Sequence, residues 1–365
     1  MPALPFPRSE LPTPALVLDR AALERNIAKM AAFAAARGIK LRPHAKTHKS
    51  AEIGRRQIEA GAAGLCCAKL GEAEALAAEG LSRLHLTSPV VAPGAIARLV
   101  ALNGRCEGLS VVADHPANVA QLDAANAAGA GPLAVLIDVD PGNHRTGVAS
   151  AVAAVALAAE IAGCAHLTLA GVQFYCGSQQ HIRDFAERRA AIAGLTDYLG
   201  GVLDALREAG HKVAVVTGGG TGSFMIDAAL SVLTELQVGS YLFLDRDYGD
   251  CDLSGDGAPA FEPALFVDAT VISANAAGMV TVDAGLKALS PDAGPPAVVG
   301  GGAYLFMGDE HGAIVSDRGL PALGARVTLL PGHCDPTVNL HDFYHVLDGE
   351  MVVEIWPVTA RGRST

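Results

Sequence analysis

The chain has 365 residues, of which 50% are hydrophobic and 18% charged, and its formal net charge at pH 7 is -11. This apolar fraction is sufficient for a buried core, which excludes a predominantly disordered chain. The acidic balance argues against binding to nucleic acid or an anionic membrane surface, and no uncharged run has the length and character of a transmembrane helix.

The N-terminus and the cysteines bear on the compartment. The opening MPALPFPRSELPTP lacks the basic region and apolar core of a secretory signal. The seven cysteines are an odd number and are scattered through apolar runs, which favours free thiols in a reducing compartment. We therefore expect a cytoplasmic protein.

Between residues 20 and 250, short β-type runs alternate with longer alanine-rich helical segments. Strands joined by helices pair in parallel through right-handed crossovers. Eight such units predict an α/β fold with a (β/α)8 barrel of the TIM type. An open, doubly wound sheet is the alternative, because periodicity does not show closure. Strands are expected at 40–42, 64–67, 83–87, 109–112, 134–138, 167–174, 212–216 and 236–240, with helices that include 20–37, 49–60, 70–79 and 181–208.

The pattern changes after Gly249. Residues 249–259 are rich in glycine, aspartate and proline and are typical of a linker. Beyond them no long helix separates the expected strands, so a mostly β C-terminal domain of residues 251–365 should follow a barrel of residues 20–250. Residues 1–19, with a strand at 13–18, are expected to join the β domain. The strands expected in that domain are 264–273, 279–283, 312–315, 326–330 and 350–356.

The loop after the first barrel strand is unusually basic. The active site of such a barrel lies at the C-terminal ends of its strands, and here RPHAKTHKS places Lys46 close to His44, His48 and Lys49. Neighbouring cations lower the pKa of an amine, and a free amine is the form that condenses with carbonyl groups. A solvent-exposed basic loop is the alternative.

A glycine-rich segment follows the seventh strand. Glycine allows positive φ and close backbone approach, so that consecutive amides can form a concave anion site. Barrel phosphate sites are often built after strands seven and eight, although a plain turn remains the alternative. A phosphate site opposite Lys46 suggests pyridoxal phosphate, joined to the lysine as an imine. The segment consists of Thr217, Gly218, Gly219, Gly220, Thr221, Gly222 and Ser223.

Three further strand ends carry polar side chains that could complete such a site. Each of them taken alone is typical of a structural or solvated residue, and it is their shared position at strand ends that makes them candidates. They are Asp138, Asn143, His144 and Arg145 after strand five, Tyr175, Gln179, Gln180 and His181 after strand six, and Tyr241, Asp245 and Tyr248 after strand eight.

The β domain contains the segment PGHCDPTVNLHD, in which His333 and Asp335 are two residues apart. On an extended segment such side chains point to the same side, whereas Cys334 would point away. An imidazole and a carboxylate suit a divalent cation such as Mn²⁺ or Zn²⁺. A polar turn is the alternative, and His311 in GDEHG is a further unassigned candidate.

Taken together, the motifs resemble those of a known family of pyridoxal-phosphate enzymes, the D-threonine aldolase and D-serine dehydratase group. The resemblance extends from Leu11 to about Trp356 and implies an alanine-racemase-like fold, a (β/α)8 barrel followed by a β domain. The motifs RPHAKTHKS, CAKLGEAEAL, DVDPGNHRTGV, QFYCGSQQH, TGGGTGS, QVGSYLFLDRDY and PGHCDPTVNLHD carry it, in this order.

The resemblance also implies roles for individual residues. Lys46 would bind the cofactor covalently, residues 217–223 would bind its phosphate, and Arg145 and Tyr175 would contact it. His333 matches a metal ligand, and the second ligand stands two residues later. Members of the group that act as dehydratases tend to have cysteine there and the aldolases aspartate, so Asp335 favours the aldolase branch.

The resemblance implies a lyase that cleaves D-threonine and related D-β-hydroxy-α-amino acids to glycine and an aldehyde. The divalent ion, Mn²⁺ in preference to Zn²⁺, Co²⁺ or Mg²⁺, would bind the β-hydroxyl and lower its pKa, with His181 as the expected base. A D-serine or D-3-hydroxyaspartate dehydratase and a D-3-hydroxyaspartate aldolase are the alternatives. Some single barrels of similar fold bind the cofactor for homeostasis, but the β domain argues against that function. A homodimer is also implied.

Overall fold

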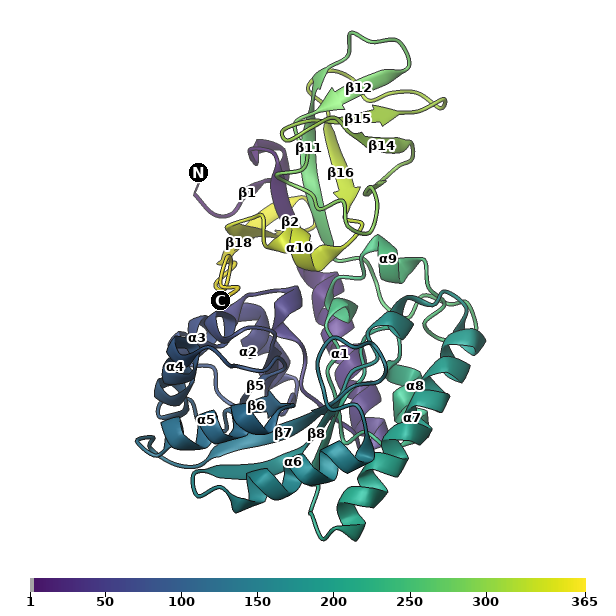
Figure 1. The fold of residues 1–365 in the computed structure, drawn as a ribbon. Coiled ribbons are helices and arrows are strands. Elements are labelled where there is room, and N and C mark those ends of the chain that lie inside the picture. Colours follow the sequence, from purple (N-terminus) through teal and green to yellow (C-terminus); the bar gives the residue numbers. More distant parts are fainter. Residues whose placement is uncertain (1–2) are drawn as a thin grey trace.

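The computed structural model describes residues 3–365 and divides into two parts, a barrel with its surrounding helices and a mostly β part that lies above it (Figure 1). This architecture confirms the predicted fold class. Among the described residues, no helix combines the length and the apolar character needed to cross a membrane.

Eight parallel strands form the sheet of the barrel, in the order β3-β10-β9-β8-β7-β6-β5-β4. A parallel bridge between His44, which lies beyond β3, and Cys66 within β4 joins the two edges of this sheet. The sheet therefore closes on itself, and the open, doubly wound alternative is wrong. The strands are β3 (Lys40–Leu41), β4 (Leu65–Cys67), β5 (Leu84–Leu86), β6 (Ser110–Ala113), β7 (Leu133–Val139), β8 (Leu167–Phe174), β9 (Val215–Gly218) and β10 (Glu235–Leu236).

Local capping sets where the helices begin and end. Asp19 accepts a hydrogen bond from the amide of Ala22 at the start of α1, which ends at Gly38 with φ 63°. The helix expected at 49–60 begins only at Ala51, because Lys49 has a φ of 49°, outside the helical region. The helix expected at 181–208 begins at Phe185 after a cap by Asp184. The barrel helices are α1 (Arg20–Arg37), α2 (Ala51–Glu59), α3 (Leu70–Ala78), α4 (Pro93–Asn103), α5 (Pro116–Asn126), α6 (Ala151–Gly163), α7 (Phe185–Glu208), α8 (Phe224–Leu230) and α9 (Arg246–Gly249).

The β part draws strands from both ends of the chain. Strand β2 lies between β11 and β17, antiparallel to the first and parallel to the second, and β1 pairs with β18. Strands β1, β13, β14 and β17 were not predicted from the sequence. The elements are β1 (Phe6–Pro7), β2 (Ala15–Asp19), β11 (Leu265–Ser273), β12 (Met279–Val282), β13 (Ala297–Val298), β14 (Ala303–Phe306), β15 (Gly312–Val315), β16 (Arg326–Leu330), α10 (Cys334–Val338), β17 (Phe343–Asp348) and β18 (Met351–Pro357).

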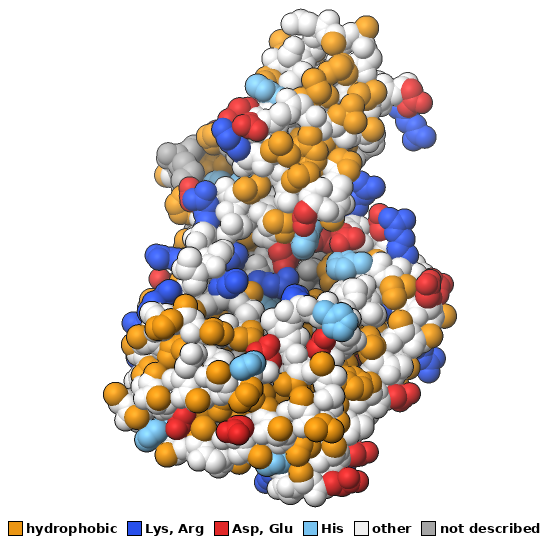
Figure 2. Space-filling view, in the orientation of Figure 1, with side chains coloured by type: hydrophobic (Ala, Val, Ile, Leu, Met, Phe, Trp, Pro, Cys, Tyr) orange, Lys and Arg blue, Asp and Glu red, His pale blue; other side chains and the backbone are white. Residues whose placement is uncertain are grey.

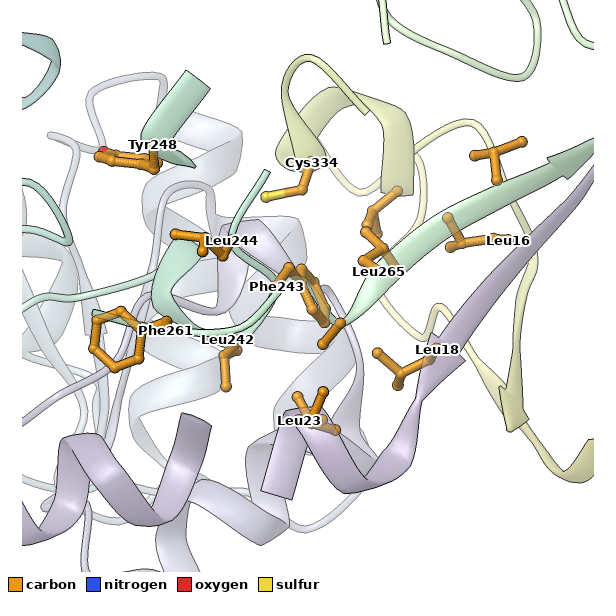
Figure 3. Close-up of a cluster of buried hydrophobic side chains, with 14 of the residues drawn as sticks. Leu16, Leu18, Leu23, Leu242, Phe243, Leu244, Tyr248, Phe261, Leu265 and Cys334 are labelled. Atoms are coloured by element: carbon orange, nitrogen blue, oxygen red, sulfur yellow. The ribbon is translucent and has the colours of Figure 1, made fainter. Parts of the chain in front are cut away.

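A continuous hydrophobic core joins the barrel to the β part. Figure 3 shows side chains of β2, of the segment after β10, of β11 and of α10 meeting at this junction. The ring centres of Phe243 and Tyr344, one from each part, are 6.0 Å apart. Each large apolar side chain buried here stabilises the arrangement by roughly 1.5–3 kcal/mol. The junction therefore holds α10 at a fixed place above the mouth of the barrel.

Candidate active site

The C-terminal ends of the barrel strands open into a cavity of about 570 Å³. Figure 2 shows the hollow between the two parts, with basic, acidic and histidine side chains gathered around it. Its wall includes His44, Lys46, Arg145, Gln173, Tyr175 and Gln237. The cavity thus brings together three of the predicted site residues, which come from the ends of three different strands.

Lys46 lies in a short 3-10 turn, Ala45–Thr47, directly after β3, and its Nζ forms an ion pair with Asp335 of the β part. Burial lowers the pKa of Lys46, but the charge of Asp335 outweighs this effect and raises the pKa above its ordinary value. The expectation that neighbouring cations lower this pKa was wrong, because the sequence does not show a carboxylate arriving from another domain.

The loop that carries Lys46 is fixed from both sides. On the barrel side, the buried Lys49 Nζ lies 2.9 Å from a carboxylate oxygen of Glu72, which is itself buried at the start of α3. On the other side, the hydroxyl of Tyr344 donates to the carbonyl of His48 at 2.6 Å. The amide of Ala360 donates to the carbonyl of Lys49 at 2.8 Å. These contacts give the backbone at Lys46 little freedom.

Arg145 and Tyr175 lie together in the cavity wall. The guanidinium carbon of Arg145 is 5.5 Å from the centre of the Tyr175 ring, a cation–π distance. Burial raises the pKa of Tyr175, although the charges of Lys46 and Arg145 partly oppose the shift. The phenol is therefore neutral near pH 7, and it can donate a hydrogen bond.

Residues 217–223 form a closely packed backbone segment after β9. Gly219 has a φ of 68°, and a Cβ at Gly222 would lie 2.0 Å from the carbonyl oxygen of Gln180, so only glycine fits there. The amide of Gly222 donates to Oε1 of Gln180 at 3.0 Å, and the hydroxyl of Ser223 donates to the buried Asp227 at 2.6 Å. Burial raises the pKa of Asp227 to about 7.

This part of the site fits the implied cofactor. A glycine segment with the buried hydroxyls of Thr217, Thr221 and Ser223 suits a phosphate group. The segment does not line the cavity that holds the amine of Lys46, but Gln237 of the cavity wall donates through Nε2 to the hydroxyl oxygen of Thr217 at 3.1 Å and so connects the two. Gln180 had been singled out only as a polar residue at a strand end. Its packing against the glycine segment, 42 residues away, has no signature in the sequence.

His181 lies in a 3-10 turn, Ser178–His181, and outside the wall of the cavity. Its Nδ1 is 2.8 Å from a carboxylate oxygen of Asp247 in α9, and its ring centre is 4.7 Å from that of Tyr248. The carboxylate orients the imidazole and leaves Nε2 as the nitrogen that can exchange a proton with another group.

His333 and Asp335 face each other across the top of the site, with 3.9 Å between Nε2 and Oδ1. The expectation of an extended segment was wrong for Asp335, because α10 begins at Cys334 and only His333 is extended. Burial raises the pKa of Asp335, but the charges of Lys46 and His333 lower it further, and the net result is well below the ordinary value. The carboxylate is therefore ionised and can act as a metal ligand.

Asp292 and Cys334 are two other candidate ligand residues next to the His333–Asp335 pair. His333 Nδ1 lies 2.7 Å from Oδ2 of Asp292, a partner 41 residues away that no sequence pattern indicates. The Cys334 side chain lies in the junction core (Figure 3). In residues 3–365 no group of three or more His, Cys, Asp or Glu side chains could hold a metal ion, and the exposed His311 joins none. An imidazole and a carboxylate suit a divalent ion whose remaining ligands are water and substrate.

Comparison with known proteins gives matches over almost the whole chain. Residues 18–247 match the family model for the alanine racemase N-terminal domain, and residues 264–347 match one described as "Putative serine dehydratase domain". A D-threonine aldolase of Arthrobacter sp. is 42% identical over 98% of this chain and 95% of the relative. A 3-hydroxy-D-aspartate aldolase of Paracoccus denitrificans (strain Pd 1222) is 38% identical over 100% of this chain and 96% of the relative.

Two further comparisons extend this result. A D-threo-3-hydroxyaspartate dehydratase of Delftia sp. (strain HT23) is 31% identical over 95% of this chain and 97% of the relative. The crystal structure of the D-threonine aldolase from Filomicrobium marinum superposes with a TM-score of 0.96, at 39% identity, and covers 100% of this chain and 99% of that one.

Proposed function

Because this chain belongs to the alanine-racemase-like family of pyridoxal-phosphate-dependent aldolases and dehydratases, we propose that it is a D-threonine aldolase that requires a divalent metal. The proposed reaction cleaves the Cα–Cβ bond of a D-β-hydroxy-α-amino acid and yields glycine and an aldehyde. One observation carries the proposal, namely that the ionised Asp335 lies against Lys46 at the barrel mouth, with the imidazole of His333 beside it.

We assign the binding of the cofactor to residues of the cavity wall and to the glycine-rich segment after β9. Lys46 would hold its aldehyde carbon, residues 217–223 would hold its phosphate, and Arg145 and Tyr175 would contact it from the cavity wall. When bound, pyridoxal phosphate supplies an electron sink that stabilises a carbanion at the α-carbon of an amino acid.

We assign the binding of the metal ion to His333 and Asp335, and removal of the proton from the substrate's β-hydroxyl group to His181. His333 and Asp335 would hold the divalent ion, for which Mn²⁺ is favoured over Zn²⁺, Co²⁺ and Mg²⁺, and such an ion supplies a Lewis acid for a hydroxyl group. Asp292 orients His333 through Nδ1, as outer partners of metal-bound histidines do. His181, oriented by Asp247, is proposed to take the proton of the β-hydroxyl.

An aldolase specific for 3-hydroxy-D-aspartate is the second candidate. Such a substrate has two carboxylates, and the cavity wall contains Lys69 and Arg145 in addition to Lys46. Among the contacts of the described residues, neither Lys69 nor Arg145 has a carboxylate partner within salt-bridge distance. Dehydration of D-serine or D-3-hydroxyaspartate is the third candidate. In that reaction Lys46 would remove the α-proton.

Product analysis separates these candidates. The purified protein with pyridoxal phosphate and Mn²⁺ is given D-threonine, and L-threonine, D-serine and D-3-hydroxyaspartate are run in parallel. Glycine and acetaldehyde from the D-isomer of threonine alone is the expected result. A 2-oxo acid with ammonia would assign the dehydratase reaction instead, and glyoxylate from D-3-hydroxyaspartate alone would assign the second candidate.

We also propose that the protein works as a homodimer in the cytoplasm. The family resemblance supports the dimer, and the free state of all seven cysteines in the described chain suits a reducing compartment. Light scattering from the purified protein tests the dimer directly, because a monomeric mass at working concentration would contradict it.

A further inference from the structure

A buried carboxylate at the junction of the two parts contacts both of them. Asp245 is 1% exposed and directly precedes α9. Its Oδ1 accepts the amide of Tyr248 at 3.2 Å and so caps that helix. Its Oδ2 accepts the amide of Cys334 at 2.8 Å, 89 residues further along the chain. Cys334 is the residue between His333 and Asp335, so this hydrogen bond ends on the metal-ligand segment itself.

Two backbone hydrogen bonds continue this contact. The amide of Arg246 donates to the carbonyl of Pro331 at 3.0 Å, and the amide of Asp247 donates to the carbonyl of Gly332 at 3.1 Å. The side chain of Asp247 in turn holds His181 through Nδ1. One short segment, residues 245–247, therefore contacts the backbone just before His333 and also orients the histidine proposed as the base.

We propose that Asp245 is a positioning residue, which fixes the His333–Asp335 pair relative to the barrel mouth through its two carboxylate oxygens. The inference rests on the proposed metal site and adds a residue that touches neither metal nor substrate. Without the contact to Cys334, the start of α10 loses the side-chain hydrogen bond that residues 245–247 make to it, and it can shift relative to the barrel. The distance between the two ligands would then vary, and a site with only two protein ligands depends strongly on that distance.

The chemistry of the position requires a carboxylate. The two amides lie on different elements, and each is satisfied by a different oxygen. Asparagine offers one acceptor, and its NH₂ group would face the second amide. Water cannot easily replace the lost oxygen, because Asp245 is itself buried and the two residues whose amides it binds, Tyr248 and Cys334, are buried as well. One buried amide would be left without a hydrogen bond, and the backbone would move to reduce this cost.

The test is a Mn²⁺ titration of the holoenzyme, in which the electron paramagnetic resonance signal of free Mn²⁺ gives the dissociation constant. Asp245→Asn should raise that constant about 10- to 100-fold, the usual effect of losing an outer partner of a metal site. Bound cofactor, read from its absorbance, should remain at the wild-type level. The matched control is Asp184→Asn, since Asp184 caps α7 through a single amide, a contact that asparagine retains.

A second variant covers the case in which Asp245→Asn does not fold. Asp245→Ser keeps an acceptor for the cap of α9, is smaller than the native side chain and reaches only one of the two amides, so it should weaken Mn²⁺ binding by a similar factor. A folded variant of either kind with the wild-type dissociation constant would overturn the role of Asp245. A wild-type holoenzyme that binds no Mn²⁺ would instead overturn the metal site and this inference together.

Discussion

Lys46 is the residue on which attachment of the cofactor depends. Replacing it by alanine removes the nucleophilic amine, so borohydride reduction should no longer attach the cofactor covalently to the protein. For the same reason kcat should fall by about three orders of magnitude or more. Mass spectrometry of the reduced protein and a turnover assay measure both effects. Lys287→Ala, at an exposed lysine paired with Glu310, is the control. Trapped cofactor and full activity in the Lys46 variant would contradict the assignment.

Asp227 leads to a pH dependence of stability. Its pKa is about 7 in the folded chain and near 3.8 when unfolded, since burial disfavours the charged form. Between pH 3.8 and about pH 7, Asp227 is ionised in the unfolded chain but still protonated in the folded chain. The free energy of unfolding therefore falls as the pH rises through this range. Each pKa unit corresponds to about 1.4 kcal/mol.

The variant Asp227→Asn removes this penalty and keeps an acceptor for the hydroxyl of Ser223. The gain in melting temperature of the cofactor-free protein should therefore increase from pH 5 to pH 7 and level off above pH 7. Thermal denaturation of the two proteins over this range measures the effect. A gain that is the same at every pH would show that Asp227 is ionised throughout.

The sequence contains the signals for most individual site residues, but not for the groups that hold them. Lys46 and residues 217–223 follow strands, where position alone makes them candidates. The partners Glu72, Asp292 and Asp247 lie far from the residues they contact, at separations that no local pattern encodes. The raised pKa of Lys46 has the same origin, since its carboxylate comes from the other end of the chain.

At the scale of elements, the turn after β9 has no room for an added side chain at Gly222. Gly222→Ala would place a Cβ 2.0 Å from the carbonyl oxygen of Gln180 and force the backbone apart. We expect the affinity for pyridoxal phosphate to fall at least about 10-fold, a loss of 1.4 kcal/mol or more. Fluorescence titration of the cofactor-free protein measures this affinity.

A second glycine supplies the control for this prediction. A Cβ at Gly201, in the middle of α7, meets no atom within 4 Å beyond its own helix. Gly201→Ala should therefore keep the cofactor affinity and stabilise the protein by about 0.5–1 kcal/mol, the usual difference between the two residues within a helix. Equal cofactor affinities in the two variants would show that the turn after β9 adapts to a side chain.

Elements with a strong local pattern are predictable, and elements created by long-range contacts are not. Helix α1 has the predicted bounds, because a cap at Asp19 and a stop at Gly38 frame it. The sequence did not indicate helix α10 at Cys334, whose amide is bound by Asp245 from a segment 89 residues earlier. Strand β17 contains His345, whose Nδ1 lies 3.1 Å from the carbonyl oxygen of Leu16, a partner near the N-terminus.

At the scale of the whole molecule, Arg8 attaches the N-terminal segment to the β part through ion pairs with the buried Asp268 and the exposed Glu350. Arg8 lies 2.7 Å from the fully buried carboxylate of Asp268, which Arg326 also contacts at 3.1 Å. Arg8→Met would remove two of the four side-chain hydrogen bonds to this carboxylate and should lower the free energy of unfolding by about 3 kcal/mol. Urea denaturation measures the loss.

An exposed ion pair of similar geometry is the control for Arg8. Arg25 lies 2.8 Å from Glu262, and both side chains are more than half exposed. Arg25→Met should change the stability very little, because water and salt screen such pairs. If both variants unfold at the same urea concentration, the N-terminal segment contributes no more to stability than a surface contact.

The position of β2 in the middle of the β sheet has a consequence for how a ribosome makes this protein. Val17 pairs with Phe266 on one side and with His345 on the other, so its neighbours are translated about 250 residues or more later. At 5–20 residues per second, this strand waits about 12–50 s for its first partner. The barrel can collapse during that interval, while an apolar strand with two unpaired edges stays accessible. Until the last strand emerges, the two edges of β2 are therefore open to pairing with strands of other chains.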